Sequence, residues 1–321
     1  MAKFNNGYSN IKVKLLNFDG ENFAKECYEF AQYGLDRDSV FWEKYDKNSR
    51  KVKDFLEELV SGLTFPKYAM LAKRVDFSIE GISRICLAQL TRDCAYFCSE
   101  SHGLRPLTQE FNIPMNMYND ESIMKKLHDA QKILESAYVE ACEKEIPFPE
   151  SRYLCLHAQT ISLTASYTPF DFARSCKSRT NNSFCDELNY VYRKMYHCLE
   201  SEISKLSDEN SKKIWSWLIN KGKCIDDGYY TRTNVFNGDF SIMHQDHTDE
   251  KPRLPAQNDW RKSCWKMELE RIYKDEPFLL TDKEKETIKS WIKSEECTST
   301  YESDNPRSAK NSIKNMYYYE A

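Results

Sequence analysis

The stretch FSIEGISRICLAQLTRDCAYFCSESHGLRPL, residues 77–107, decides how this chain is interpreted, because it sets charged side chains among apolar ones. Arg84 lies between Ile82 and Ile85, Arg92 comes after Leu90, and Arg105 follows in the same stretch. A buried arginine needs an anionic partner, since an unpaired buried charge is very costly. Acids of the same fold are one set of candidate partners: Asp76, Glu80, Asp93 and Glu100. The alternative is a bound phosphate or carboxylate, whose oxygens match the planar fork of arginine.

A second stretch repeats this pattern. It reads IPFPESRYLCLHAQTISLTASYTPFDFARSCKSRTNNSFCDELNYVY over residues 146–192, and it places Arg152, Arg174 and Arg179 among apolar and aromatic residues. Two separate stretches of this kind in one domain predict a cleft that holds a polyanionic ligand.

Composition and charge exclude several classes of protein. The chain has 321 residues, of which 40% are hydrophobic and 30% charged, enough for one large domain or two smaller ones. Its net charge of −4 gives no general attraction to nucleic acid or to a membrane surface. We find no apolar run of about 18 residues and no signal peptide. We therefore expect a cytoplasmic protein with neither a membrane nor a nucleic-acid partner.

The 12 cysteines include no C-x-x-C pair. In a reducing cytosol such scattered cysteines are usually small buried hydrophobes. A metal site can be sketched from Cys94 and Cys98, at helical spacing, together with His244 and His247. Because the spacings match no established zinc pattern, we expect no metal.

Hydrophobic periodicity predicts a mixture of helices and strands. Only 9 glycines and 10 prolines interrupt the chain, which favours long helices. The helical period predicts helices over residues 39–63, 80–97, 122–144, 183–206 and 282–294. Strands are predicted over residues 10–18 and 73–79, whereas residues 153–167 fit either a strand or a buried helix. The expected fold class is α+β, with a polar, loop-like composition after about residue 206.

The two stretches resemble the signature regions of the flavin-dependent thymidylate synthases. The first family region contains Gly-Ile-Ser-Arg, then Gln-x-x-Arg-His-Arg, then a turn bearing Ser and Glu that ends in Arg-Tyr. The matching residues here are Gly81-Ile82-Ser83-Arg84, Gln89, Arg92, Glu100, Ser101 and Arg105. In the second region, Arg152, Arg179 and Glu187 fall at the family spacings. The resemblance covers about residues 10–205.

The sequence also departs from the family pattern. The family Arg-His-Arg is Arg92-Asp93-Cys94 here, and a central Asn and Arg are replaced by Thr168 and Phe170. The nucleotide half of the implied site is therefore better kept than the flavin half.

The resemblance implies a flavin-dependent thymidylate synthase-like core, a mixed sheet packed with long helices, over residues 1–205. Residues 206–321 form a C-terminal extension outside it. The implied nucleotide-binding residues are Gln89, Arg92, Glu100, Ser101, Arg105, Arg152 and Arg179. Arg179 takes the catalytic position, where an arginine contacts the pyrimidine ring and favours its ionisation at N3, making C5 nucleophilic. The implied cofactor-binding residues are Arg92, Asp93, Glu100 and Arg174.

The implied function is flavin-dependent one-carbon transfer to C5 of a pyrimidine deoxynucleotide monophosphate such as dUMP, by methylation or hydroxymethylation. FAD would be the cofactor, NADPH and methylenetetrahydrofolate the co-substrates, and a homotetramer the assembly. The base can be uracil or cytosine, with Asp93, Asn181 and Asn182 as candidate acceptors for an exocyclic amine. The alternatives are a non-catalytic nucleotide-binding relative or scaffold of the same fold, and a helical interaction protein whose arginines are structural.

Overall fold

The computed structural model describes residues 2–33, 50–61, 73–94, 96–99, 110–180, 186–221, 268–280 and 282–293. Within these residues a four-stranded antiparallel sheet has the order β2-β3-β6-β4. Its strands are β2 (Lys12–Phe18), β3 (Val75–Ser83), β6 (Thr160–Tyr167) and β4 (Tyr96–Ser99). A second, parallel pair joins β1 (Lys3–Asn6) to β5 (Glu110–Ile113). With the helices around these sheets, the expected α+β class is confirmed.

Strand β3 lies at the centre of the sheet, and its sequence explains why. Its side chains alternate between buried and partly exposed, with Phe77 and Ile79 fully buried. The alternation breaks at Gly81, which has a φ of +77° and lies where the register with β6 shifts between Ile79 and Ile82. This left-handed backbone suits glycine, and the irregularity turns the end of the strand toward the next helix.

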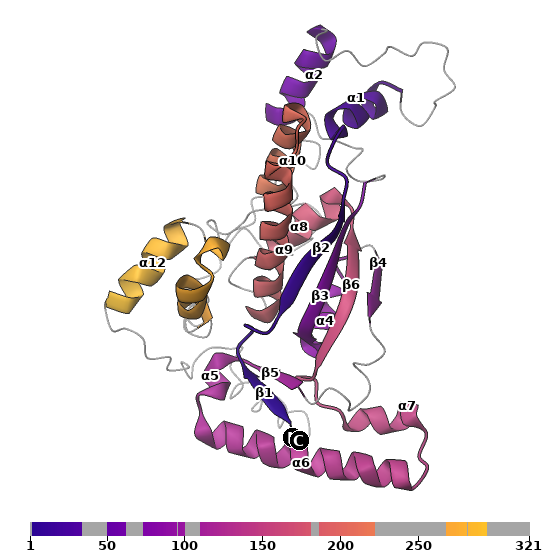
Figure 1. The fold of residues 1–321 in the computed structure, drawn as a ribbon, viewed down its shortest axis with the longest axis vertical. Coiled ribbons are helices and arrows are strands. Elements are labelled where there is room, and N and C mark those ends of the chain that lie inside the picture. Colours follow the sequence, from indigo (N-terminus) through magenta and orange to yellow (C-terminus); the bar gives the residue numbers. More distant parts are fainter. Residues whose placement is uncertain are drawn as a thin grey trace, which may run out of the picture.

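Long helices pack along the sheet and at one end of it (Figure 1). These are α8 (Pro169–Arg179), α9 (Asp186–Ser204) and α10 (Glu209–Lys221), with α1 (Phe23–Tyr33) and α2 (Arg50–Ser61) around the end of α10. Helix α9 lies against β2, and α10 contacts both α8 and α9. Trp215 of α10 stacks on Phe23 of α1, and both side chains are fully buried.

Helix α6 (Glu121–Glu143) crosses the opposite end of the molecule, below β1 and β5 in Figure 1. The Asp120 side chain caps it by accepting a hydrogen bond from the Ile123 backbone N–H at 3.0 Å. The short helix α5 (Met115–Tyr118) precedes it, and α7 (Phe148–Ser151) and the 3-10 helix η2 (Arg152–Leu154) follow. Of the 23 residues in α6 only Ala141 is buried, so most of this helix is accessible in the single chain.

The described part of the C-terminal region packs against α9. It comprises helical residues 268–275, η5 (Pro277–Leu279) and α12 (Asp282–Lys293). Its apolar side chains belong to the same core as those of α9 and α10: Leu269, Ile272, Leu279, Leu280 and Ile288. The hydrophobic core therefore continues beyond residue 205, where the sequence predicts a domain boundary, and the division into two parts stays a prediction.

Most expected elements are present, and one is wrong. The helices expected over 122–144, 183–206 and 282–294 are confirmed as α6, α9 and α12. The strands expected over 10–18 and 73–79 correspond to β2 and β3, and the ambiguous segment 153–167 contains η2 and then β6. The helix expected over 39–63 is described only from residue 50, as α2.

The expected helix over 80–97 is incorrect, because the chain there forms the end of β3, the short helix α4 (Arg84–Leu90) and strand β4. The strand extends to Ser83 because it pairs with β2 and β6, and Ser83 then caps α4 with its side chain. Tertiary pairing thus overrides the helical period. No helix in the described residues combines the length and apolar character needed to cross a bilayer.

Candidate functional site

The first signature stretch is anchored by a buried carboxylate on α9. Glu187 accepts hydrogen bonds from the Ser83 backbone N–H at 2.7 Å, the Ser83 hydroxyl at 2.5 Å and the Asn112 amide at 2.9 Å. The Ser83 oxygen in turn accepts from the Cys86 N–H, which caps α4. Burial raises the pKa of Glu187 above its usual range. This network fixes the start of α4 relative to α9 and β5, and α4 carries the next site residues.

Arg179, the residue in the implied catalytic position, forms a bidentate ion pair with Asp93. The Arg179 Nε lies 2.8 Å from Asp93 Oδ2, and Nη2 lies 2.8 Å from Oδ1. Arg179 is the last residue of α8, and Asp93 follows the last turn of α4. The two side chains are 13% and 9% exposed. The structure therefore brings together two predicted site residues that are 86 positions apart in the sequence.

Two buried tyrosines extend this pair into the core. The Tyr192 hydroxyl donates to Asp93 Oδ2 at 3.4 Å, and it lies 3.1 Å from the Tyr167 hydroxyl. Burial raises the pKa of both phenols well above the usual value, so both stay protonated at neutral pH. Sequence reasoning missed these residues, since the chain has 20 tyrosines and no motif distinguishes these two.

Gln89 and Arg92 lie on the same turn as Asp93. Gln89 is half-buried near the end of α4, and Arg92 is exposed just after it, where its backbone N–H donates to the Gln89 carbonyl at 3.2 Å. Arg152 is the first residue of η2. Glu100, Ser101, Arg105, Asn181 and Asn182 lie outside the described residues. The nucleotide-binding assignments therefore stay predictions.

The positions that depart from the family pattern have structural roles. Thr168 caps α8 by accepting from the Asp171 N–H at 3.0 Å, and its hydroxyl donates to the Asp171 carboxylate at 2.7 Å. The Phe170 side chain is buried in the hydrophobic core. Arg174 lies 3.6 Å from Asp171, and its buried Nε has no hydrogen-bond acceptor among the described residues. Thr168 and Phe170 thus support α8 and the core, whereas Arg174 has a buried donor without an acceptor in the described part of the chain.

The two cysteines of the candidate metal site do not lie on one helix. Cys94 lies in the turn after α4, and Cys98 lies on β4, so they do not share a helix face. Burial raises the pKa of Cys94 to about 11, which keeps its thiol protonated and a poor ligand or nucleophile. His244 and His247 lie outside the described residues. Among those described, no three His, Cys, Asp or Glu side chains are grouped to hold a metal ion.

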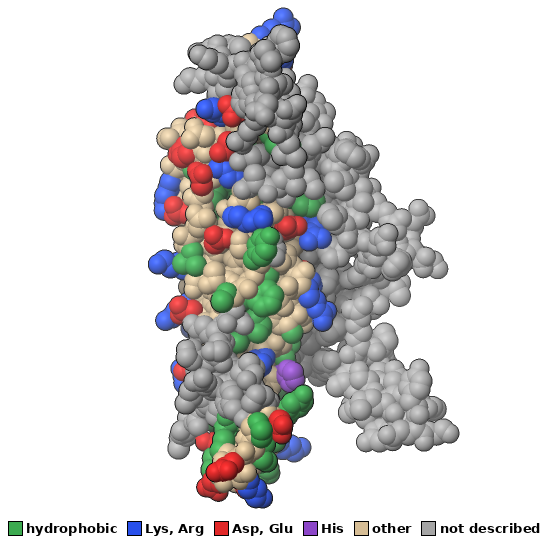
Figure 2. Space-filling model, turned by 90° about the vertical axis from the view of Figure 1, so that its right-hand side faces the viewer, with side chains coloured by type: hydrophobic (Ala, Val, Ile, Leu, Met, Phe, Trp, Pro, Cys, Tyr) green, Lys and Arg blue, Asp and Glu red, His purple; other side chains and the backbone are tan. Residues whose placement is uncertain are grey.

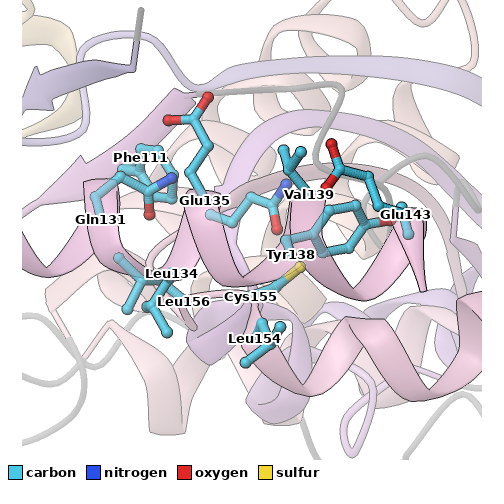
Figure 3. Close-up of a pocket in the computed structure, with 12 residues that line it drawn as sticks. Phe111, Gln131, Leu134, Glu135, Tyr138, Val139, Glu143, Leu154, Cys155 and Leu156 are labelled. Atoms are coloured by element: carbon cyan, nitrogen blue, oxygen red, sulfur yellow. The ribbon is translucent and has the colours of Figure 1, made fainter. Parts of the chain in front are cut away.

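A pocket of about 460 Å³ lies beside α6, in the volume range of small-ligand sites (Figure 3). Figure 3 shows the carboxylates of Glu135 and Glu143 on one side of it and Leu134, Leu154 and Leu156 on the other. The rest of its lining is formed by Phe111, Gln131, Tyr138, Val139, Cys142, Cys155 and Gln159. No residue of the sequence-predicted site lines this pocket.

No protein-family model and no curated protein sequence matches the chain. Solved structures do show similarity. The UMP/dUMP methylase PolB from Streptomyces cacaoi, bound with 5-Br dUMP, matches with 14% identity and a TM-score of 0.47, over 67% of this chain and 97% of that one. The flavin-dependent thymidylate synthase ThyX from Helicobacter pylori, complexed with FAD and dUMP, matches with 16% identity and a TM-score of 0.45, over 62% and 98%.

These solved structures include flavin-dependent thymidylate synthases, the family whose signature regions the two stretches resemble. A fold of this kind does not determine activity, which depends on the residues of the site.

Proposed function

We propose that this chain is a divergent flavin-dependent thymidylate synthase that transfers a one-carbon unit to C5 of a pyrimidine deoxynucleotide monophosphate, as a methyl or a hydroxymethyl group. The observation that carries the proposal is the placement of Arg179. Its guanidinium is held by two hydrogen bonds to Asp93, beside the turn that bears Gln89 and Arg92. The proposal rests on this geometry and on the two signature stretches of the sequence.

The chemistry of Arg179 suits the proposed role. An arginine stays protonated at any physiological pH and supplies N–H donors in a fixed plane. Such donors stabilise negative charge that develops on a pyrimidine ring as its C5 becomes nucleophilic. The carboxylate of Asp93 fixes the orientation of the fork, and the buried Tyr192 holds Asp93 in turn. We assign binding of the nucleotide monophosphate to Gln89, Arg92, Glu100, Ser101, Arg105 and Arg152.

FAD is the proposed cofactor, and the described residues fit it through their charge. Arg92 is an exposed cation, and Arg174 has a buried Nε without an acceptor among the described residues. These two side chains would hold the anionic diphosphate. Bound FAD supplies hydride transfer, with NADPH and methylenetetrahydrofolate as proposed co-substrates. Because Asp93 forms an ion pair with Arg179, we assign it to the nucleotide site in preference to the flavin site.

A homotetramer is the proposed assembly, supported by the exposed apolar side chains of α6. Ile133 is 69% exposed, and Ile123 and Val139 are also exposed. Figure 2 shows hydrophobic side chains among charged ones at the lower end of the molecule, where α6 lies in Figure 1, and further hydrophobic side chains along the middle of the same face. A long helix with this surface is typical of an interface between chains.

The first experiment is an absorbance spectrum of the purified protein in the near-ultraviolet and visible, before and after addition of FAD. Flavin bands are expected. Turnover is then measured with dUMP or dCMP in the presence of methylenetetrahydrofolate and NADPH. Flavin-free nucleotide binding without turnover would select the alternative, a non-catalytic relative of the same fold.

A substitution of Arg179 tests its role. Arg179→Lys keeps a positive charge beside Asp93 but loses the bidentate fork, so we expect the fold to be kept and turnover to fall by about 100-fold or more. Arg50→Lys is the matched control, because Arg50 is an exposed arginine on α2 that pairs only with the exposed Asp54 among the described residues. Full activity of the Arg179→Lys variant would show that the assignment of Arg179 is wrong.

A further inference from the structure

The carboxylate of Asp93 is positioned to accept one more hydrogen bond. In the described part of the chain it accepts bonds from Arg179 Nε and Tyr192 on Oδ2 and from Arg179 Nη2 on Oδ1. An ionised carboxylate has about four lone-pair sites and no donor. Oδ1 accepts one hydrogen bond from the described residues and retains capacity for another, and the Asp93 side chain is 9% exposed.

In the Arg179–Asp93 pair the acceptor Asp93 Oδ1 lies 2.8 Å from the donor Arg179 Nη2. The two candidate bases differ in how well their own donors and acceptors match an acceptor beside a donor. Cytosine carries an amine donor at position 4 and an acceptor at N3. Uracil carries an acceptor at position 4 and an N–H donor at N3. An edge with the carboxylate facing position 4 and the guanidinium facing N3 therefore matches cytosine at both positions. Against uracil it opposes acceptor to acceptor and donor to donor, which leaves desolvated polar groups unpaired.

Charge favours the same base. Activation of uracil places negative charge on N3 and on the oxygen at position 4 when the ring ionises. A carboxylate beside that oxygen opposes the charge, and it also offsets the positive charge of Arg179, 2.8 Å away. The amine of cytosine donates to the carboxylate instead, and this hydrogen bond increases the electron density that the amine nitrogen shares with C5.

From this geometry we infer that the site takes a cytosine nucleotide in preference to a uracil nucleotide, and that Asp93 determines the choice. The inference rests on the proposed function, because it requires a pyrimidine base at Arg179. It goes beyond that function by naming the base, which the sequence left open between uracil and cytosine. It also gives a reason for the aspartate at a position where the family pattern has histidine.

The test is isothermal titration calorimetry of the full chain with dCMP and with dUMP, without added flavin. We expect dCMP to bind about tenfold more tightly or better, the range of one well-placed pair of hydrogen bonds. In Asp93→Asn the preference should be lost or reversed, because an amide can donate to the uracil oxygen. Asp93→Glu keeps an acceptor-only group and should still favour dCMP. This second variant distinguishes a changed base preference from a loss of folding in Asp93→Asn.

Asp76→Asn is the matched control. Asp76 is an aspartate of β3 whose carboxylate accepts a bond from the Asn17 amide, and its substitution should leave the preference for dCMP unchanged. Equal or tighter binding of dUMP to the unmodified protein would overturn the inference while leaving the proposed function in place. Binding of neither nucleotide would overturn both.

Discussion

Replacement of Glu284 by Gln is expected to destabilise the protein by about 3 kcal/mol, because it removes the counter-ion of a buried arginine. Arg193 is only 1% exposed, and it donates to the two Glu284 oxygens at 2.9 and 2.7 Å. Removal of one partner from a buried pair costs roughly 3–5 kcal/mol. The lower end applies here, because a glutamine oxygen still accepts one bond and the Asn189 side chain and Leu279 carbonyl remain as acceptors.

The assay is urea denaturation followed by tryptophan fluorescence, with linear extrapolation of the free energy of unfolding to water. A loss of about 3 kcal/mol changes the unfolding equilibrium more than roughly a hundredfold, since about 1.4 kcal/mol is a factor of ten. Glu286→Gln is the control on the same helix, because its pair with Lys289 is exposed and should contribute at most about 0.5 kcal/mol. Equal effects of the two substitutions would refute the reasoning that the C-terminal region is fixed to α9 by the buried pair.

Three further predictions concern the pH response, the backbone and the assembly. The folded protein raises the pKa of Glu187, so the free energy of unfolding should fall as pH rises from the ordinary glutamate pKa through the raised one; Glu187→Gln should remove this fall in urea titrations at several pH values. Gly81→Ala should cost about 1–2 kcal/mol, because φ is +77° and the new Cβ would lie 3.0 Å from the Asn10 amide; an unchanged thermal midpoint would contradict this. Ile133→Glu on α6 should dissociate the proposed tetramer, and an unchanged mass in analytical ultracentrifugation would show that α6 is not the interface.

The long helices could be predicted from the sequence because their apolar period continues over many turns. Helices α6 and α9 are examples, and both lie within a few residues of the expected bounds. The expected helix over residues 80–97 failed for a local reason. The strand bends at Gly81, which has a positive φ, and it ends at Ser83, which caps the helix. Only the pairing with β2 and β6 shows that the first part of this segment is a strand.

Part of the site could also be predicted from the sequence. Arg179 and Asp93 could each be singled out from the motif, but their ion pair depends on how α8 and α4 end relative to one another. Tyr167 and Tyr192 could not be singled out, because what makes them part of the site is a contact in space with Asp93 and with each other. Spacing in a sequence identifies residue types that suit a role, whereas hydrogen bonds across elements need the packed structure.

The strand order of the sheet has a consequence for synthesis of the protein. Strand β4 pairs with β6, which lies far later in the chain, so β4 leaves the ribosome long before its partner exists. Even in the finished fold its Tyr96 and Phe97 side chains are exposed. Until residues 160–167 are made, this aromatic strand offers unpaired backbone groups to neighbouring nascent chains. Soluble yield should therefore depend on chaperones or on slow, cool expression, more than on the stability of the final structure.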